Sequence, residues 1–154
     1  ARNEVTNRQF AQFDSQHDSR LEPGDFLHFD PVYRGNPLNG PDQPVVKVSW
    51  EEAIGYCDWL SEKTGLDVGL PTEQEWEWAC RAGAETSFWY GDGDSEFERY
   101  AILADAQFRA TTRSKRIEWR PAITCQDDGY HVSAPACSLA PNPRRLLDMH
   151  GNLA

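Results

Sequence analysis

The sequence lacks most of the short motifs that identify common classes of enzyme and metal-binding protein. It has no G-x-S-x-G motif, no phosphate-binding loop and no Rossmann glycine pattern. No two of its four histidines are spaced i, i+4, as a helical zinc-hydrolase site requires. Its cysteines contain no C-x-x-C pair and match no zinc-ribbon spacing. They are Cys57, Cys80, Cys125 and Cys137, an even number that allows disulfides without showing any.

Basic residues and long apolar runs are also scarce. With 15 basic against 25 acidic residues, the net charge is −10, which disfavours nucleic acid or an anionic membrane as a partner. No apolar run approaches the ~20 residues that a membrane span needs. There is no signal peptide, but both ends look cut from a longer chain, so the localisation stays open. We therefore expect residues 1–154 alone to expose apolar surface.

What is present is enough chain for one domain with a real core, at 154 residues. Hydrophobic residues make up 39% of the sequence and aromatic residues 12%, with 6 Trp, which argues against a disordered chain. The aromatic content indicates a loop-rich fold, because large rings can hold irregular backbone together.

Three helix starts share one pattern, the capping box. A Ser or Thr caps the helix, and a Glu or Gln three residues later reaches back to its amide. The predicted pairs are Thr6–Gln9, Ser49–Glu52 and Thr72–Glu75.

The third helix is predicted between Thr72 and Gly83, where glycine can take the left-handed conformation that ends a helix. Trp76, Ala79 and Cys80 share one face, so we predict a core helix without chemistry of its own. Cys80, like Cys57 in the second helix, is predicted to be a small buried apolar residue.

The first and second helices show the same apolar periodicity. Phe10 and Phe13 give the first helix an apolar face, and it is expected to end near Gln16. In the second helix, apolar residues recur at helical spacing over 50–60, and Gly65 ends it.

The rest of the chain is predicted to be mostly irregular. Residues 14–43 form a long polar loop with an extended piece around 26–29. A short strand is predicted at 44–48 and an extended segment at 100–105. Residues 147–152 are expected to form a compact polar turn.

Two late turns combine carboxylates with glycine. One contains Asp127 and Asp128, and the other contains Asp148, Gly151 and Asn152. Carboxylate and carbonyl oxygens are what Ca²⁺ prefers, at ~2.3–2.6 Å. The same residues also cap turns through Asx hydrogen bonds, so the spacing leaves both readings open.

Taken together, the motifs resemble the formylglycine-generating enzyme family, also called the sulfatase-modifying factor domain. The blocks that carry the resemblance are Glu4-Val-Thr-Asn7, Gln43-Pro-Val-Val-Lys-Val-Ser-Trp-Glu-Glu-Ala53, Tyr56-Cys-Asp-Trp-Leu60, Leu70-Pro-Thr-Glu-Gln-Glu-Trp-Glu-Trp-Ala-Cys-Arg-Ala-Gly83, Tyr90-Gly-Asp92, Asp127-Asp-Gly129, Ser133-Ala-Pro135, Pro141-Asn-Pro143 and Leu147-Asp-Met-His-Gly-Asn152. Their order and spacing make the match specific. It covers residues 1–154 as part of a family domain that continues on both sides.

The resemblance implies an α+β fold that is a variant of the C-type-lectin-like type, with few helices, short strands and much irregular structure. Enzymes of the family oxidise a cysteine of a sulfatase peptide to formylglycine with O₂ and copper. Their two copper-binding cysteines lie in a block beyond residue 154, so no catalytic residue is assigned here. Cys57 and Cys80 instead match helix positions that form disulfides in some members.

The resemblance also implies two structural Ca²⁺ sites. The first maps to the carbonyl of Leu103, the carboxylate of Asp128 and the carbonyl of Tyr130. Ile102 stands where the family has an Asn ligand, which removes one oxygen.

The second Ca²⁺ site maps to Asp148 and the carbonyls of Gly151 and Leu153, with a Glu that would follow Ala154. Arg145 stands where the family commonly has Gly, and we therefore expect a changed turn.

Three functions are compatible with the resemblance. The first is an oxidase acting on a sulfatase-like peptide or protein, as a monomer. The second is a non-catalytic binding module for an unidentified ligand, with residues 14–43 and 111–120 as candidate contact loops. The third is an iron-dependent sulfoxide synthase of ergothioneine biosynthesis, whose iron histidines come from an N-terminal helical domain that this sequence does not contain.

Overall fold

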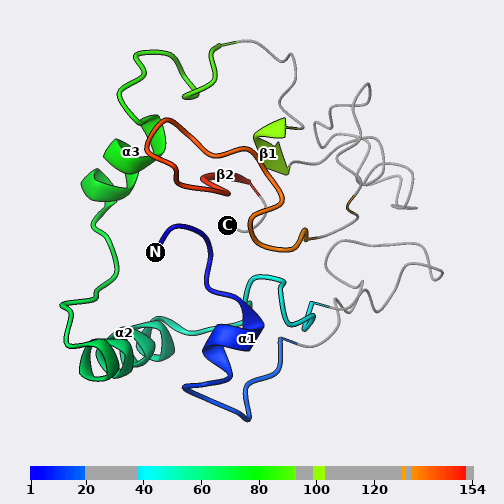
Figure 1. Cartoon of the computed structure of the whole chain (residues 1–154), viewed down its shortest axis with the longest axis vertical. Helices are drawn as coiled ribbons and strands as arrows, with labels where there is room; N and C mark the ends of the chain where they lie inside the picture. The colour runs from blue at the N-terminus through cyan, green and yellow to red at the C-terminus, as the bar shows by residue number, and fades with distance from the viewer. Residues whose placement is uncertain (20–37, 93–98, 103–129, 131–132, 152–154) are drawn as a thin grey trace, which may run out of the picture.

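The computed structural model describes residues 1–19, 38–92, 99–102, 130 and 133–151. Within them, short helices and two short strands are joined by long irregular segments (Figure 1). The elements are α1 (Asn7–Phe10), α2 (Trp50–Thr64), α3 (Glu73–Arg81), β1 (Ala101–Ile102) and β2 (His150–Gly151). The predicted α+β architecture with few helices and little strand is confirmed.

All three predicted capping boxes are present. In the box of α2, the amide of Ser49 donates to Glu52 Oε2 at 2.7 Å. The helix then ends as predicted at Gly65, which has φ +70°. The third helix ends one residue earlier than predicted, because Ala82 rather than Gly83 is the C-cap residue, with φ +52°.

The first helix is shorter than the sequence predicts, because α1 ends at Phe10 rather than near Gln16. The chain continues in turns, and the Asp14 Oδ1 atom accepts a hydrogen bond from the amide of Gln16 at 2.9 Å. Such an Asx turn offers the backbone an alternative partner to the helix.

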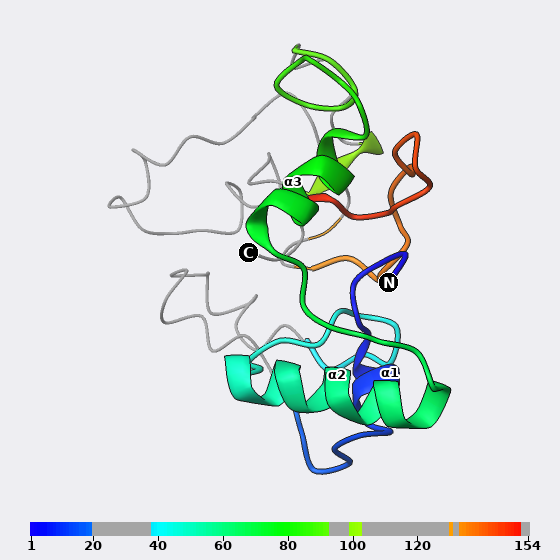
Figure 2. The same ribbon diagram turned by 90° about the vertical axis from the view of Figure 1, so that its left-hand side faces the viewer.

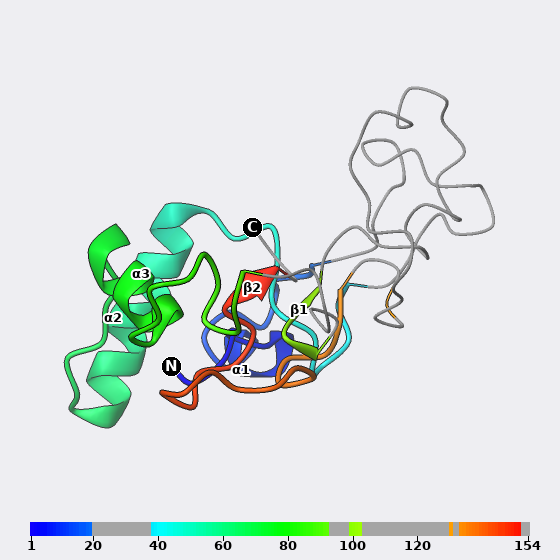
Figure 3. The same ribbon diagram turned by 90° about the horizontal axis from the view of Figure 1, so that it is seen from above.

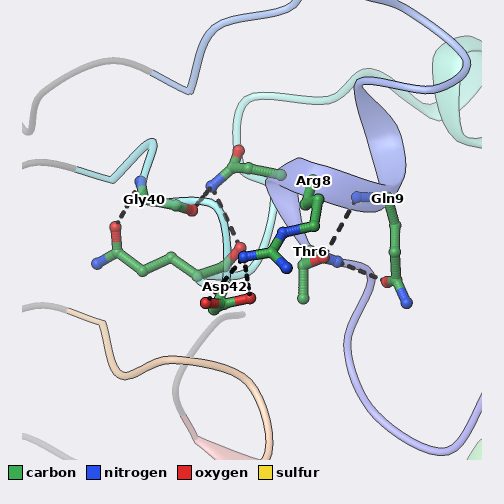
Figure 4. Close-up of polar contacts among 7 residues, drawn as sticks. Thr6, Arg8, Gln9, Gly40 and Asp42 are labelled. Atoms are coloured by element: carbon green, nitrogen blue, oxygen red, sulfur yellow. Dashed lines mark hydrogen bonds and ion pairs between the residues drawn. The ribbon is translucent and has the colours of Figure 1, made fainter.

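Polar contacts join α1 to a loop distant in sequence (Figure 4). The side-chain amide of Asn7 donates to the carbonyls of Leu38 and Gly40, at 2.8 and 3.0 Å. The Arg8 guanidinium lies 3.0 Å from the Asp42 carboxylate. Asn7 therefore supplies both hydrogens of its amide to fix irregular backbone.

Aromatic rings form the junction of α1 and α2, which lie side by side in Figures 1 and 2. Phe10 is 2% exposed and stacks on Tyr56 with 5.4 Å between ring centroids. Phe13 lies 5.9 Å from Tyr56 and 6.0 Å from Trp59. At this junction the rings pack α1 and the turn that follows it against α2.

The third helix is less buried than predicted. Cys80 is 4% exposed, as predicted, but Trp76 is 49% and Trp78 62% exposed. The prediction of a core helix is therefore wrong at Trp76, because within the described part of the chain α3 is covered mainly at its C-terminal turn. The exposed large apolar residues among those described are Trp50, Leu66, Leu70, Trp76, Trp78 and Phe88.

Regular strand structure differs from the prediction in two places. Residues 44–48 form no strand, because Lys47 takes φ +61° and only the isolated bridge between Thr6 and Pro44 remains there. In the predicted polar turn, β2 pairs in parallel with β1 in the register Ala101 to His150 (Figure 3). The predicted extended segment 100–105 is confirmed over β1, and its remainder lies outside the described residues.

Candidate functional site

The candidate site lies in the C-terminal segment, which runs from Pro141 past Asp148 to β2. Its anchor is Asn142, which is 3% exposed. The Asn142 amide donates to the Ala79 carbonyl of α3 at 2.8 Å, and its Oδ1 accepts from the amides of Arg144 and Leu146 at 3.0 Å each. One buried side chain thus supplies hydrogen-bond partners both to a carbonyl at the end of α3 and to two amides of a tight turn.

The Asp148 carboxylate faces the backbone of the preceding loop. Its Oδ2 accepts from the amide of Cys137 at 2.7 Å, and the amide of Leu139 also donates to it. Burial raises the pKa of Asp148, while these two hydrogen bonds act against the rise. Asp148 also has φ +56°, a left-handed conformation that Asp tolerates. The carboxylate thus joins two stretches of backbone about ten residues apart, which is a longer-range contact than the local Asx turn that the sequence left open.

The other predicted Ca²⁺ ligands are only partly placed. Tyr130 is half-buried and packs against Ala134 and Leu139, the latter in the loop that Asp148 holds. Gly151 lies in β2 with φ +73°.

The remaining predicted ligands lie outside the described residues; they are Leu103, Asp128 and Leu153. The whole segment 103–129, which follows Ile102, lies outside them too. Ligation of Ca²⁺ by either set of residues stays a prediction.

A thiol and an imidazole meet beside this segment. Cys80 Sγ lies 3.5 Å from the Met149 carbonyl and 3.6 Å from His150 Nε2. Burial raises the pKa of Cys80 and lowers the pKa of His150, so both groups favour their neutral forms. The pair therefore lacks the thiolate–imidazolium character of a cysteine nucleophile.

Aromatic rings enclose His150. The rings of Phe88 and Tyr90 approach it edge-on, at 5.3 and 5.5 Å between centroids. Tyr90 also stacks on Tyr100 at 4.7 Å. This packing explains the desolvation of the imidazole and joins β2 to the segment that precedes β1.

The sequence did not reveal the roles of Asn7 and Asn142. Both stand within blocks that resemble the family, and Asn142 lies between two prolines that cannot donate backbone hydrogen bonds. That Pro-Asn-Pro pattern is a signal for a side chain used in place of backbone donors, but it does not identify the acceptor on α3.

Comparison with known families gives a match over the whole chain. The model of the sulfatase-modifying factor enzyme 1-like domain matches residues 1–154. This chain belongs to that family. The resemblance inferred from the helix caps and the late turns is thereby confirmed.

Relatives of this sulfatase-modifying factor domain include proteins with and without activity in their names. The chain is 31% identical over 117 residues to formylglycine-generating enzyme from Bos taurus, covering 75% of this chain and 26% of that protein. It is 32% identical over 111 residues to inactive C-alpha-formylglycine-generating enzyme 2 from Bos taurus, covering 71% and 31%. The chain thus spans about a quarter to a third of these relatives.

A solved structure supports the fold of the sulfatase-modifying factor domain. The structure of PvdO from Pseudomonas aeruginosa is similar to this chain with a TM-score of 0.67 and 24% sequence identity, over 99% of this chain and 52% of that one. At this identity the likeness bears on the fold alone.

Proposed function

We propose that this chain is part of a formylglycine-generating-enzyme-like protein that oxidises a cysteine of a sulfatase peptide to formylglycine with O₂ and copper. The supporting observation is the family match over residues 1–154, together with relatives about 30% identical that are named formylglycine-generating enzymes. In this proposal the chain supplies scaffold, in a variant of the C-type-lectin-like fold. The whole protein acts on a peptide or protein, as a monomer.

The described thiols do not fit a copper site. Cys57 lies on α2, Cys80 on α3 and Cys137 in the loop before the C-terminal segment, and all three are free. Desolvation raises the pKa of each thiol, which disfavours the thiolate that a metal needs. No step of the oxidation is therefore assigned to the residues that the structure describes.

Calcium fits the described residues better. Asp148 is a carboxylate held in place by two backbone amides, and its oxygens have further lone pairs for a cation. We propose that bound Ca²⁺ favours the charged form of Asp148 and fixes the turn before β2. Tyr130 would belong to a second such site, beside the same loop.

A non-catalytic binding module is the alternative function, and one observation favours it. A relative with 32% identity is named an inactive enzyme, so the family includes members without the activity. In the Cys80–His150 pair, burial raises the pKa of Cys80 and lowers the pKa of His150, which is consistent with a scaffold in either case. No helix among the described residues is long and apolar enough to cross a membrane.

A turnover assay distinguishes the two proposed functions. The whole protein is loaded with copper and incubated in air with a cysteine-containing sulfatase peptide, and a hydrazide probe detects aldehyde. The oxidase predicts aldehyde that disappears with a copper chelator and with a peptide whose cysteine is replaced by serine. Saturable peptide binding that survives chelation, with no aldehyde, would instead support the binding module.

A further inference from the structure

Three side chains with metal-binding atoms meet where the turn after α1 approaches the first turn of α2. They are Asp14, His17 and Glu52, and one ligand atom from each lies within 4.8 Å of the others. Asp14 and His17 belong to one turn, in which the His17 amide donates to the Asp14 carbonyl. Glu52 is the capping-box residue of α2. The cluster therefore joins two elements that are far apart in sequence.

The backbone orients the imidazole of this cluster. His17 Nε2 lies 2.9 Å from the carbonyl oxygen of Val46. Because a carbonyl can only accept, this ring nitrogen carries the hydrogen, and Nδ1 keeps its lone pair in the neutral ring. A histidine that binds a metal commonly donates its other N–H to a carbonyl in this way, which fixes the tautomer and the ring orientation.

Each of the two carboxylates accepts a backbone hydrogen bond through one of its oxygens. Asp14 Oδ1 accepts from the amide of Gln16 at 2.9 Å, and Glu52 Oε2 accepts from the amide of Ser49 at 2.7 Å. The Ser49 side chain also hydrogen-bonds to the Glu52 carboxylate, and the structure records no hydrogen bond to Asp14 Oδ2 from the described residues. Hydrogen bonds from Ser49 lower the pKa of Glu52, so this carboxylate is charged at neutral pH although Asp14 repels it.

Aromatic packing makes the floor of the cluster rigid. The His17 ring meets Phe10 edge-on at 4.9 Å, and Phe10 is buried against Tyr56 of α2. The three ligands themselves are half-buried or exposed, so water and ions can reach them.

We propose that Asp14, His17 and Glu52 form a binding site for a divalent cation of the Zn²⁺ class. One imidazole and two carboxylates suit Zn²⁺ better than Ca²⁺, which takes oxygen ligands. Ligands of tetrahedral Zn²⁺ at ~2.0–2.2 Å lie about 3.4 Å from one another, so the side chains close inward on binding. Water takes the fourth position, and the ion clamps the turn after α1 to α2.

The test measures Zn²⁺ affinity of the metal-free whole protein by calorimetry, with Co²⁺ absorption as a spectroscopic report on the ligands. His17→Gln keeps an N–H that can donate to the Val46 carbonyl but removes the imidazole. Glu52→Gln keeps a capping box, since Gln serves at that position. The matched control is Glu75→Gln, which makes the same change in the capping box of α3, outside the cluster.

We expect His17→Gln and Glu52→Gln each to raise the Zn²⁺ dissociation constant about tenfold or more. Glu75→Gln should bind like the wild type. Equal affinities in all four proteins would overturn the proposal, as would Ca²⁺ binding at the cluster as tightly as Zn²⁺. Because the comparison is between variants, Zn²⁺ held by cysteines elsewhere does not affect the outcome. Thermal unfolding in chelator checks that each variant is folded.

Discussion

The side chain of Asn142 donates a hydrogen bond to the main-chain carbonyl of Ala79, at 2.8 Å, across more than sixty residues of sequence. This contact fastens the C-terminal segment to the end of α3. Asn142 is 3% exposed, so water cannot take over its hydrogen bonds to the backbone if the side chain is removed.

We predict that Asn142→Ala lowers the free energy of unfolding by about 1–3 kcal/mol, because it removes the side-chain partner of one part-buried carbonyl and two backbone amides. The control is Asn39→Ala, which removes an exposed amide that donates to Asp18 at 3.1 Å and should cost less than about 0.5 kcal/mol. The urea midpoint of the whole protein, at unchanged slope, measures both. Equal shifts for the two variants would contradict the role given to Asn142.

Arg145 takes φ +64°, a backbone conformation that favours glycine. Its side chain is exposed and its carbonyl accepts from Arg2 Nε, a bond that survives any side-chain change. Arg145→Gly should therefore stabilise the protein by about 1 kcal/mol.

The reciprocal change is Gly65→Ala at φ +70°, which should destabilise by about 1 kcal/mol. Thermal unfolding of both variants checks the pair. A loss of stability in Arg145→Gly would show that the Arg145 side chain contributes more than the strained backbone costs.

Acid should weaken the fold through His150. Burial lowers the pKa of His150 below its usual 6.5, so the unfolded chain takes up the proton first. The stability from the neutral ring is complete above pH 6.5 and is lost as the pH falls through the folded-state pKa. His150→Phe keeps an aromatic ring against Phe88 and Tyr90, and should reduce the fall in melting temperature between pH 6.5 and about pH 5. An equal fall in melting temperature for the two proteins over this pH range would contradict this account.

Calcium should stabilise the whole protein. A ligand that binds only the folded state stabilises it by RT ln(1 + [L]/Kd), so millimolar Ca²⁺ should raise the melting temperature over that in excess chelator. Asp148→Asn and Asp128→Asn should each reduce that rise. A melting temperature that is the same in Ca²⁺ and in excess chelator would argue against Asp148 and Asp128 as Ca²⁺ ligands.

Much of the local structure could be predicted from the sequence because its causes are local. Each capping box needs only two side chains three residues apart, and all three were predicted and are present. The burial of Cys57 and Cys80 followed from helical periodicity in the same way. The strand expected at 44–48 failed because the positive φ of Lys47 interrupts a run whose composition alone is typical of a strand.

Contacts between distant segments could not be predicted. The pairing of β2 with β1 joins two-residue strands that carry no periodic signal. The convergence of Asp14 and His17 with Glu52 depends on how α1 packs on α2. The exposure of Trp76 is likewise a property of which segments cover α3, since the helix by itself shows an apolar face.

The most direct test of the proposed oxidase is the aldehyde formed per O₂ consumed when the copper-loaded whole protein turns over a sulfatase peptide. The proposal predicts aldehyde that accumulates with O₂ uptake and requires the peptide cysteine. Peptide binding without aldehyde and without cysteine-dependent O₂ uptake would contradict it.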